Sequence, residues 1–164
     1  MVDTLYSTRE QATHDYDWRV SHGLMRRLIK LMRRQPNKLL SYETVTEHLT
    51  INGQHDAGIK VIPVKQIVGS VGRTNDFDRE FYPLDDKSRD RWVNVAGAMY
   101  SGKALPPVDV YQIHDTYFVI DGNHRISVMR HNGQEYVEAH IIEVDTPDCI
   151  DLMTGEPSTC HCER

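Results

Sequence analysis

The sequence has little of what would place it in several large classes of protein. Among its 164 residues are only three cysteines, Cys149, Cys160 and Cys162, all near the C-terminus. An odd number of late cysteines predicts no disulfide framework and favours a reducing cytoplasm. No apolar run approaches the ~20 residues of a membrane span, and the polar N-terminal stretch is unlike a secretory signal. We therefore expect a cytoplasmic protein without a membrane span.

The chain also lacks an excess of positive charge. Its 19 Lys and Arg residues are outnumbered by 24 Asp and Glu, which gives a formal net charge of −5. An acidic chain is poorly suited to coating a nucleic acid, so DNA is possible but not the favoured partner. The nine histidines show no spacing typical of a metal site. The adjacent ligands Cys160, His161 and Cys162 are only a weak metal signal, and their role stays open.

What is present suffices for one folded domain with an appendage. Charged residues make up 26% and hydrophobic residues 39% of the chain, as in globular proteins. A chain of this length can bury a core without disulfides. The pattern divides the chain into four segments: a flexible N-terminus over 1–17, a helical extension over 18–58, an α/β domain over 59–145 and a tail over 146–164.

The helical extension has apolar residues at helical spacing, namely Val20, Leu24, Leu28 and Leu31. This stripe is typical of an amphipathic helix that packs on a core, and Pro36 would end it. The opposite face is basic, with Arg19, Arg26, Arg27, Lys30, Arg33 and Arg34. Such a face favours a solvated surface, with nucleic-acid phosphates or an anionic membrane as alternatives. Ser41 is a candidate N-cap for a second helix.

The domain over 59–145 mixes strands and helices. Strands are predicted over 60–64, 108–113, 117–120 and 136–144, and helices over 88–100 and 124–132. A short turn joins the second and third strands as a hairpin. This order has few strands and a hairpin, which argues against a doubly wound dinucleotide fold.

The junction between the hairpin and the next helix is the most informative feature. It reads Asp121-Gly122-Asn123-His124-Arg125. A strand that enters a helix through a glycine turn exposes backbone N–H groups beside the positive end of the helix dipole, which suits phosphate. Arg125 adds donors for phosphate oxygens, and Asp121 could hold a bridging cation. A plain turn, with Asp121 or Asn123 capping the helix, would use the same residues.

Further candidates lie in the loop that follows residues 69–72. Arg73 could reach phosphate, while Asp76 and Glu80 are candidate bases for phosphoryl transfer. A surface salt bridge and a solvated acidic turn are the ordinary alternatives. His124 could donate to phosphate or transfer a proton because its usual pKa is near neutral, and simple packing in the first helical turn is equally compatible.

Two short motifs in this order of elements carry a family resemblance. They are LPPV at 105–108, before the hairpin, and DGNHR at 121–125, after it. Together with Arg73, these two motifs resemble those of the ParB/sulfiredoxin superfamily, over about residues 59–145. The resemblance implies a compact α/β (α+β) ParB/sulfiredoxin-like domain, here with an N-terminal helical extension.

The resemblance also implies a nucleotide site at the strand-to-helix turn, with the triphosphate near Arg125. The implied phosphate-binding residues are Gly122, Asn123, His124, Arg125 and Arg73. Asp121 would hold Mg²⁺, and Asp121, His124, Asp76 and Glu80 are the catalytic candidates. In the superfamily, ParB-type partition proteins bind and hydrolyse CTP while clamping on DNA, sulfiredoxins use ATP to repair an oxidised cysteine, and free-serine kinases phosphorylate serine.

This sequence departs from each branch. The sulfiredoxin motif Gly-Cys-His-Arg has a nucleophilic cysteine where this chain has Asn123, so we expect no sulfinic acid repair. ParB-type proteins continue into a further nucleotide motif and a helix-turn-helix, whereas this chain ends soon after Val144, so we expect no site-specific partition-type DNA binding. Asn123 and His124 replace the His-Thr pair of the serine kinases.

The sequence therefore predicts a protein that binds a nucleoside triphosphate, ATP or CTP, with Mg²⁺. The expected reaction is phosphoryl transfer to a small-molecule or protein acceptor, or nucleotide hydrolysis. The alternative is a non-catalytic module that binds DNA or a partner protein through the helix over 19–34. The base of the nucleotide, the acceptor and the oligomeric state stay open.

Overall fold

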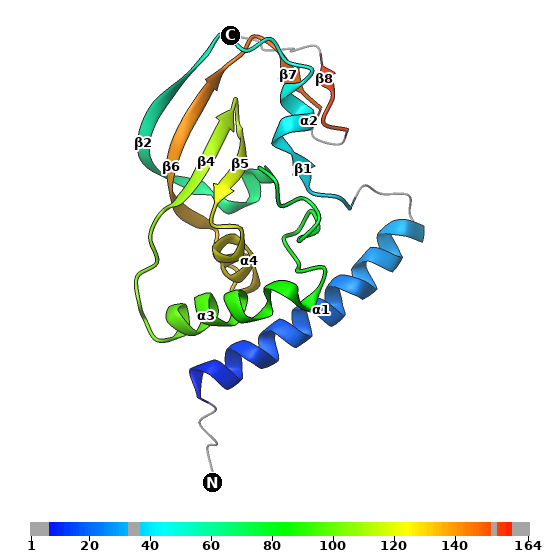
Figure 1. Ribbon diagram of the computed structural model, residues 1–164, viewed down its shortest axis with the longest axis vertical. Helices are drawn as coiled ribbons and strands as arrows, with labels where there is room; N and C mark the ends of the chain where they lie inside the picture. Colours follow the sequence, from blue (N-terminus) through cyan, green and yellow to red (C-terminus); the bar gives the residue numbers. More distant parts are fainter. Residues whose placement is uncertain (1–6, 33–36, 152–153, 159–164) are drawn as a thin grey trace.

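The centre of the molecule is a mixed six-stranded sheet, seen in a computed structural model that describes residues 7–32, 37–151 and 154–158. The strand order is β1-β3-β5-β4-β6-β2 (Figure 1). The strands are β1 (Leu40–Ser41), β2 (Gly53–Pro63), β3 (Ile67–Ser70), β4 (Val108–Ile113), β5 (Thr116–Asp121) and β6 (Tyr136–Asp145). A separate pair joins β7 (Cys149–Ile150) to β8 (Pro157–Ser158).

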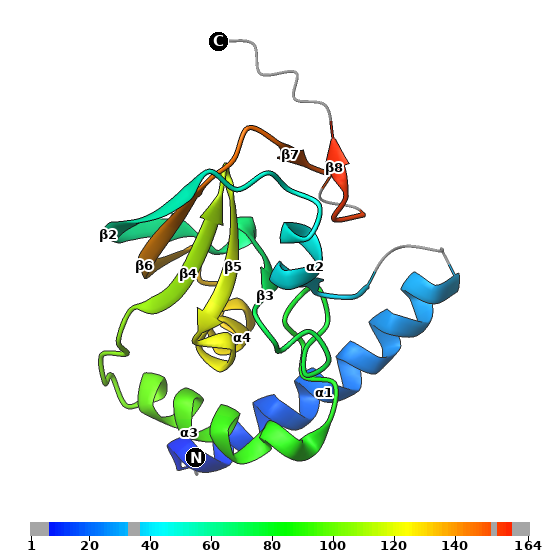
Figure 2. The same cartoon turned by 45° about the horizontal axis from the view of Figure 1, so that its top comes forward.

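Four α-helices accompany the sheet in the described residues. They are α1 (Thr8–Met32), α2 (Tyr42–Thr46), α3 (Arg89–Tyr100) and α4 (Asn123–His131), with short 3-10 turns η1 (Val64–Gln66) and η2 (Asp86–Ser88). Figure 2 shows α3 and α1 on the side of α4 that faces away from the sheet. Helices α1 and α3 therefore form an outer layer, and α4 lies between them and the strands.

The pairing of β3 and β5 decides which loops can meet. The two strands are adjacent and parallel, with Ser70 opposite Val119. Parallel neighbours end at the same edge of a sheet. The loop that follows β3 and the turn that follows β5 therefore leave the sheet together, and this brings the segment around Arg73 toward the segment around Asp121.

The core lies on both sides of α4. Toward the sheet, Ile126 and Met129 pack with the aromatic rings of Phe77 and Phe81 and with inward-facing strand residues. Away from the sheet, Val128 belongs to a second cluster built from Ala12, Tyr16, Trp92, Val93 and Ala96. The buried indole of Trp92 donates to Ser127 Oγ at 2.9 Å, which ties α3 to α4. Both faces of α4 are thus held, and its two ends are fixed relative to the sheet.

The elements with the clearest sequence pattern are confirmed. The strand over 108–113, the hairpin and the helix ending at Tyr100 all form, and β6 extends the predicted strand by one residue. The Ser41 side chain caps α2 by accepting from the N–H of Thr44 at 3.3 Å. The α/β fold class with an N-terminal helix is therefore as predicted.

The N-terminal segment differs from the expectation of a flexible stretch over 1–17. Residues 8–17 belong to α1, and Ala12 and Tyr16 are fully buried; residues 1–6 lie outside the described part. The inward face of α1 is formed by Ala12, Tyr16, Arg19 and Gly23, which follow one another at helical spacing. Arg19 was expected on the solvated face, yet it is only 2% exposed.

The apolar stripe of α1 also differs from its prediction. Leu24, Leu28 and Leu31 were expected to pack on a core, but they are 52%, 58% and 76% exposed. The reason is tertiary, because the helix passes α3 and then projects beyond the domain, as both ribbon views show. None of the helices in the described residues is both long and apolar enough to cross a membrane.

Two further boundaries differ. β2 begins at Gly53 instead of residue 60, because the polar stretch before residue 60 pairs with β6 at an exposed edge of the sheet. The predicted tail contains the β7–β8 pair, and Gly155 is buried close to Leu40 and Val45.

Cys149 is disulfide-bonded, contrary to the expectation of no disulfide framework. Cys160, His161 and Cys162 lie outside the described residues.

Candidate functional site

The turn between β5 and α4 requires glycine. Gly122 has a φ of 109°, a left-handed conformation that glycine tolerates best. A Cβ atom there would lie 2.6 Å from Cγ1 of Val108, so the turn is also too tight for a larger residue. The N–H of Ile126 closes the first helical turn on the carbonyl of Gly122 at 2.9 Å. The sequence therefore folds at this position into a sharp, rigid entry to α4.

No side chain of the described residues caps the start of α4. The N-cap position is Gly122, and the alternative of a plain turn capped by Asp121 or Asn123 is not what forms. The first N–H groups of a helix have no partner within the helix, and they add to the positive end of its dipole. The start of α4 thus keeps backbone donors that an anion could use.

Arg125 holds the turn in place. Its Nη1 donates to the carbonyl oxygens of Pro106 at 2.8 Å and Pro107 at 2.6 Å, and its Nη2 bonds the carboxylate of Asp121. The Arg125 side chain is 11% exposed, whereas that of Asp121 is 73% exposed. The guanidinium therefore connects the segment before β4 to the turn, and the role of Arg125 toward phosphate stays a prediction.

Two buried polar atoms at the start of α4 have no hydrogen-bond partner among the described residues. Asn123 and His124 are both buried, and neither Asn123 Oδ1 nor His124 Nε2 makes a hydrogen bond there. The imidazole packs edge-on against the ring of Phe77, with 5.2 Å between ring centroids. Buried polar atoms are rarely left without a partner, so these two atoms are candidates for contact with a ligand or an ordered water.

The surroundings of His124 keep its imidazole neutral. Burial, together with the positive charges of Arg91 and Arg73, lowers the pKa of His124 to about 4, against opposing contributions from Asp76 and Asp121. Arg73 is paired with Asp76 at 2.8 Å. Arg73 and Asp76 therefore lie close enough to the turn for their charges to act on His124, and their roles toward a nucleotide stay a prediction.

Arg91 is a site residue that sequence reasoning missed. It lies on α3, some thirty residues before the turn, and no motif surrounds it. Only the packing of α3 against α4 brings it near His124. A lone arginine on an amphipathic helix has no sequence signal that would distinguish it from a solvated one.

Glu80, a predicted base, lies away from the turn. Its Oε2 is 3.7 Å from Nη1 of Arg130, near the opposite end of α4. The cause is a tight reversal at buried Asp78, whose Oδ1 accepts from the N–H groups of Glu80 and Tyr82, each at 2.9 Å. Of the two acids proposed from the loop, only Asp76 is close to His124.

A divalent cation would have few protein ligands here. The described residues contain no group of three His, Cys, Asp or Glu side chains that could hold a metal ion. Mg²⁺ is often bound by only one or two carboxylates together with the phosphates of a nucleotide. The exposed carboxylate of Asp121 fits that second arrangement.

The geometry defines a class: a small α/β domain whose central hairpin leads through a glycine turn into a buried helix. The family model for the ParB N-terminal domain matches residues 28–157, most of the chain. The protein therefore belongs to the ParB N-terminal domain family, within the ParB/sulfiredoxin superfamily to which its motifs were assigned.

A comparison with solved structures found the crystal structure of sulfiredoxin from Arabidopsis thaliana. It is 19% identical, with a TM-score of 0.38, over 51% of this chain and 82% of that chain. Among curated proteins, no relative matches.

Proposed function

We propose that this protein binds a nucleoside triphosphate at the Asp121–Arg125 turn and uses it, with Mg²⁺, for phosphoryl transfer or hydrolysis. The observation that supports this most is the uncapped start of α4, where Asn123 Oδ1 and His124 Nε2 are buried without a partner in the described part of the chain. A nucleotide supplies both kinds of missing partner. Its phosphate oxygens can accept from backbone N–H groups and from His124, and its hydroxyl or amino groups can donate to Asn123.

The local charge also favours a triphosphate. The helix dipole, Arg73 and Arg91 all present positive charge to the same end of α4. A neutral His124 can donate from Nε2 in one tautomer without bringing a buried charge of its own. The anchoring of Arg125 on Pro106 and Pro107 keeps these donors in place before the ligand arrives.

In the proposed reaction, Asp76 is the base. Movement of Arg73 from Asp76 to a phosphate oxygen would free the carboxylate to accept the proton of an attacking hydroxyl or water. The new oxygen–phosphorus bond forms as the bond to the nucleoside diphosphate breaks. Asp121 would hold Mg²⁺, which would neutralise phosphate charge when bound. The acceptor is a small molecule, a protein hydroxyl or water.

Calorimetric titration with ATP, CTP, GTP and UTP, each with Mg²⁺, tests binding. We expect one of these nucleotides to bind and to shift the backbone amide resonances of residues 123–125. Arg91→Ala should weaken its affinity about 3- to 10-fold, as expected for removal of one phosphate-facing charge. Lys87→Ala, a nearby exposed cation absent from the surroundings of His124, should change it less than 2-fold.

Product release by the same nucleotide tests catalysis. Asp76→Asn should retain nucleotide affinity within about 3-fold and lose most of the turnover, since an amide cannot accept the proton. Asp121→Asn should lower the turnover by weakening Mg²⁺ binding. No binding of any nucleotide, together with salt-dependent retention of DNA or a protein through α1, would contradict the proposal and select the non-catalytic alternative.

A further inference from the structure

A hollow lies at the opposite end of α4 from the turn. It has a volume of about 740 Å³ and is walled by α1, the connection between β2 and β3, residues 79–82 and residues 133–136. This volume is typical of sites for small molecules, ~300–1,000 Å³. The nine residues of α4 place its ends about 13 Å apart. The hollow is therefore a separate place from the candidate nucleotide site.

The lining of this pocket is cationic. Its positive side chains are Arg19, Arg26, Lys65, Arg79 and Arg130. Its carboxylates are Glu80 and Glu135, so five cations face two anions, an excess of three charges. The whole chain has the opposite sign, with a net charge of −5. Concentration of positive charge in one hollow of an acidic protein attracts anions to that place.

Two of the cations, buried Arg19 and partly buried Arg130, are hydrogen-bonded to backbone carbonyl oxygens. Arg19 Nη2 donates to the carbonyls of Glu80 at 3.1 Å and Phe81 at 3.3 Å. Arg130 donates to three carbonyls, including those of Val64 at 2.9 Å and Ile67 at 2.8 Å. Carbonyl oxygens satisfy donors but leave the net charge in place.

The two guanidiniums are not fully bonded. Burial lowers the pKa of Arg19 to about 10, so the group is still protonated at neutral pH. The Nε atoms of Arg19 and Arg130 are buried and make no hydrogen bond to a described residue. Glu80 lies 3.7 Å from Arg130, and Asp78 acts on both arginines, so these carboxylates offset part of the positive charge.

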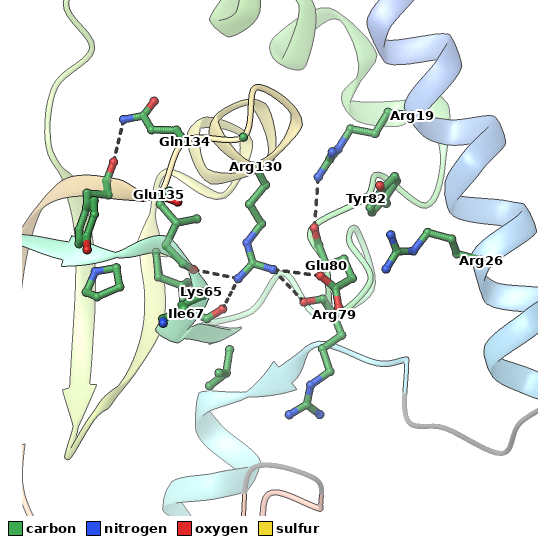
Figure 3. A pocket seen from close by; sticks show the side chains of 15 residues that line it. Arg19, Arg26, Lys65, Ile67, Arg79, Glu80, Tyr82, Arg130, Gln134 and Glu135 are labelled. Atoms are coloured by element: carbon green, nitrogen blue, oxygen red, sulfur yellow. Dashed lines mark hydrogen bonds and ion pairs between the residues drawn. The ribbon is translucent and has the colours of Figure 1, made fainter.

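Two exposed cations, Arg26 and Lys65, complete the pocket. Figure 3 shows Arg19 and Arg26 extending from α1 toward Tyr82 and Glu80, and Arg130 projecting from α4. The Arg26 guanidinium lies 5.3 Å from the centre of the Tyr82 ring, and that of Arg19 lies 4.0 Å from it. Neither Arg26 nor Lys65 forms an ion pair with another described residue. Both are thus available to a ligand.

We propose that this pocket binds a small phosphorylated molecule, with a phosphate group held by Arg26 and Lys65 above the charges of buried Arg19 and partly buried Arg130. Phosphate fits because it carries two negative charges and accepts several hydrogen bonds, which guanidinium groups match well. The limited volume of the pocket favours a small molecule over a polymer, whose charges would spread along the surface. The inference is independent of the proposed nucleotide site.

Titration of the full chain with inorganic pyrophosphate, without Mg²⁺, tests this pocket. Calorimetry measures affinity, and amide resonances of residues 133–135 report on the pocket while those of 123–125 report on the turn. We expect shifts at 133–135, and at least a 5-fold loss of affinity in Arg26→Ala and in Lys65→Ala. Arg27→Ala is the matched control: it removes the same charge from the next position of α1, outside the pocket, and should change affinity less than 2-fold.

Several outcomes would overturn the inference. Equal losses in Arg26→Ala and Arg27→Ala would show diffuse attraction to α1. Shifts confined to 123–125 would place the anion at the turn alone. Binding of a single-stranded oligonucleotide with no response to pyrophosphate would make the surface a polymer site. Failure of the proposed function is distinguishable, because it is the absence of shifts at 123–125 with every Mg²⁺-nucleotide.

Discussion

The two ends of α4 use the same device with opposite electrostatic results. At the N-terminal end Arg125 binds the carbonyls of Pro106 and Pro107, and at the C-terminal end Arg130 binds those of Val64, Ile67 and Arg79. Each arginine thereby joins distant connections to one helix. At the first end Asp121 neutralises the guanidinium, whereas at the second Glu80 faces several cations.

The two ends of α4 differ in the groups that they offer to an anion. The N-terminal end offers backbone N–H groups and a neutral imidazole, arranged by a rigid glycine turn. The C-terminal end offers net side-chain charge around a hollow. Backbone donors give a fixed direction of approach, while flexible cations such as Lys65 and Arg26 give attraction with less geometric selection.

The largest expected effect comes from removing the carbonyl anchor at the C-terminal end. Arg130→Met keeps much of the packing but leaves three carbonyl acceptors without their donor. We expect the free energy of unfolding to fall by about 3–4 kcal/mol. Urea unfolding measures this, with Arg130→Lys as the control that retains charge and should lose less. A loss under about 1 kcal/mol would show that the anchor matters little.

A smaller loss is expected from a methyl group at the N-terminal turn. Gly122→Ala puts a Cβ atom 2.6 Å from Val108 Cγ1 on a backbone with a φ of 109°, and should cost about 2–3 kcal/mol of stability. Gly133→Ala is the matched control at the other end of α4: its φ is 68°, but no atom lies within 4 Å of the new methyl. It should cost about 1 kcal/mol. Equal losses would assign the effect to backbone conformation alone.

The smallest effect is a pH dependence at His124. Its pKa falls from 6.5 in the unfolded chain to about 4 in the folded one. Above about pH 6.5, His124 is neutral in the folded and in the unfolded state, so it does not change stability there. As the pH falls below 6.5, the unfolded state binds the proton first, and stability is lost until the pH reaches about 4. At pH 5 this loss is about 2 kcal/mol.

The control for this pH dependence is His124→Gln. Denaturant unfolding at pH 7.5 and pH 5 should show a smaller loss of stability in the variant than in the wild type. Burial also lowers the pKa of His131, so His131 adds its own pH dependence of stability. Both proteins retain His131, and its effect therefore cancels when their losses of stability are compared. An identical loss in the two proteins would mean that His124 takes up its proton as easily in the folded state as in the unfolded one.

Much of the fold could be predicted because local pattern and tertiary environment agree. The strand over 108–113 is rich in apolar residues and lies between turn residues. Helix α3 ends just before Gly102, where the next connection begins. The entry to α4 was predicted because Gly122 and its polar neighbours stand between a strand pattern and a helix pattern. Such signals act within about ten residues, so a single sequence contains them.

The misread features depend on contacts that are distant in the sequence. Two apolar stripes compete along α1, and only packing against α3 decides that Ala12 and Tyr16 face inward while Leu28 is exposed. Likewise, the reversal at Asp78 sends Asp76 and Glu80 to opposite ends of α4. Helical periodicity identifies an apolar face but not the surface that covers it.

By itself, then, the sequence determined the class of fold, the family and the position of the strand-to-helix turn, since each is written in short motifs and local periodicity. Only the tertiary structure decided the electrostatics: that Arg125 anchors on carbonyls, that Arg91 approaches His124, and that buried Arg19 joins a cationic hollow. The physical reason is that a charge acts through its surroundings. Burial and neighbours set its effect, and both are assembled from distant parts of the chain.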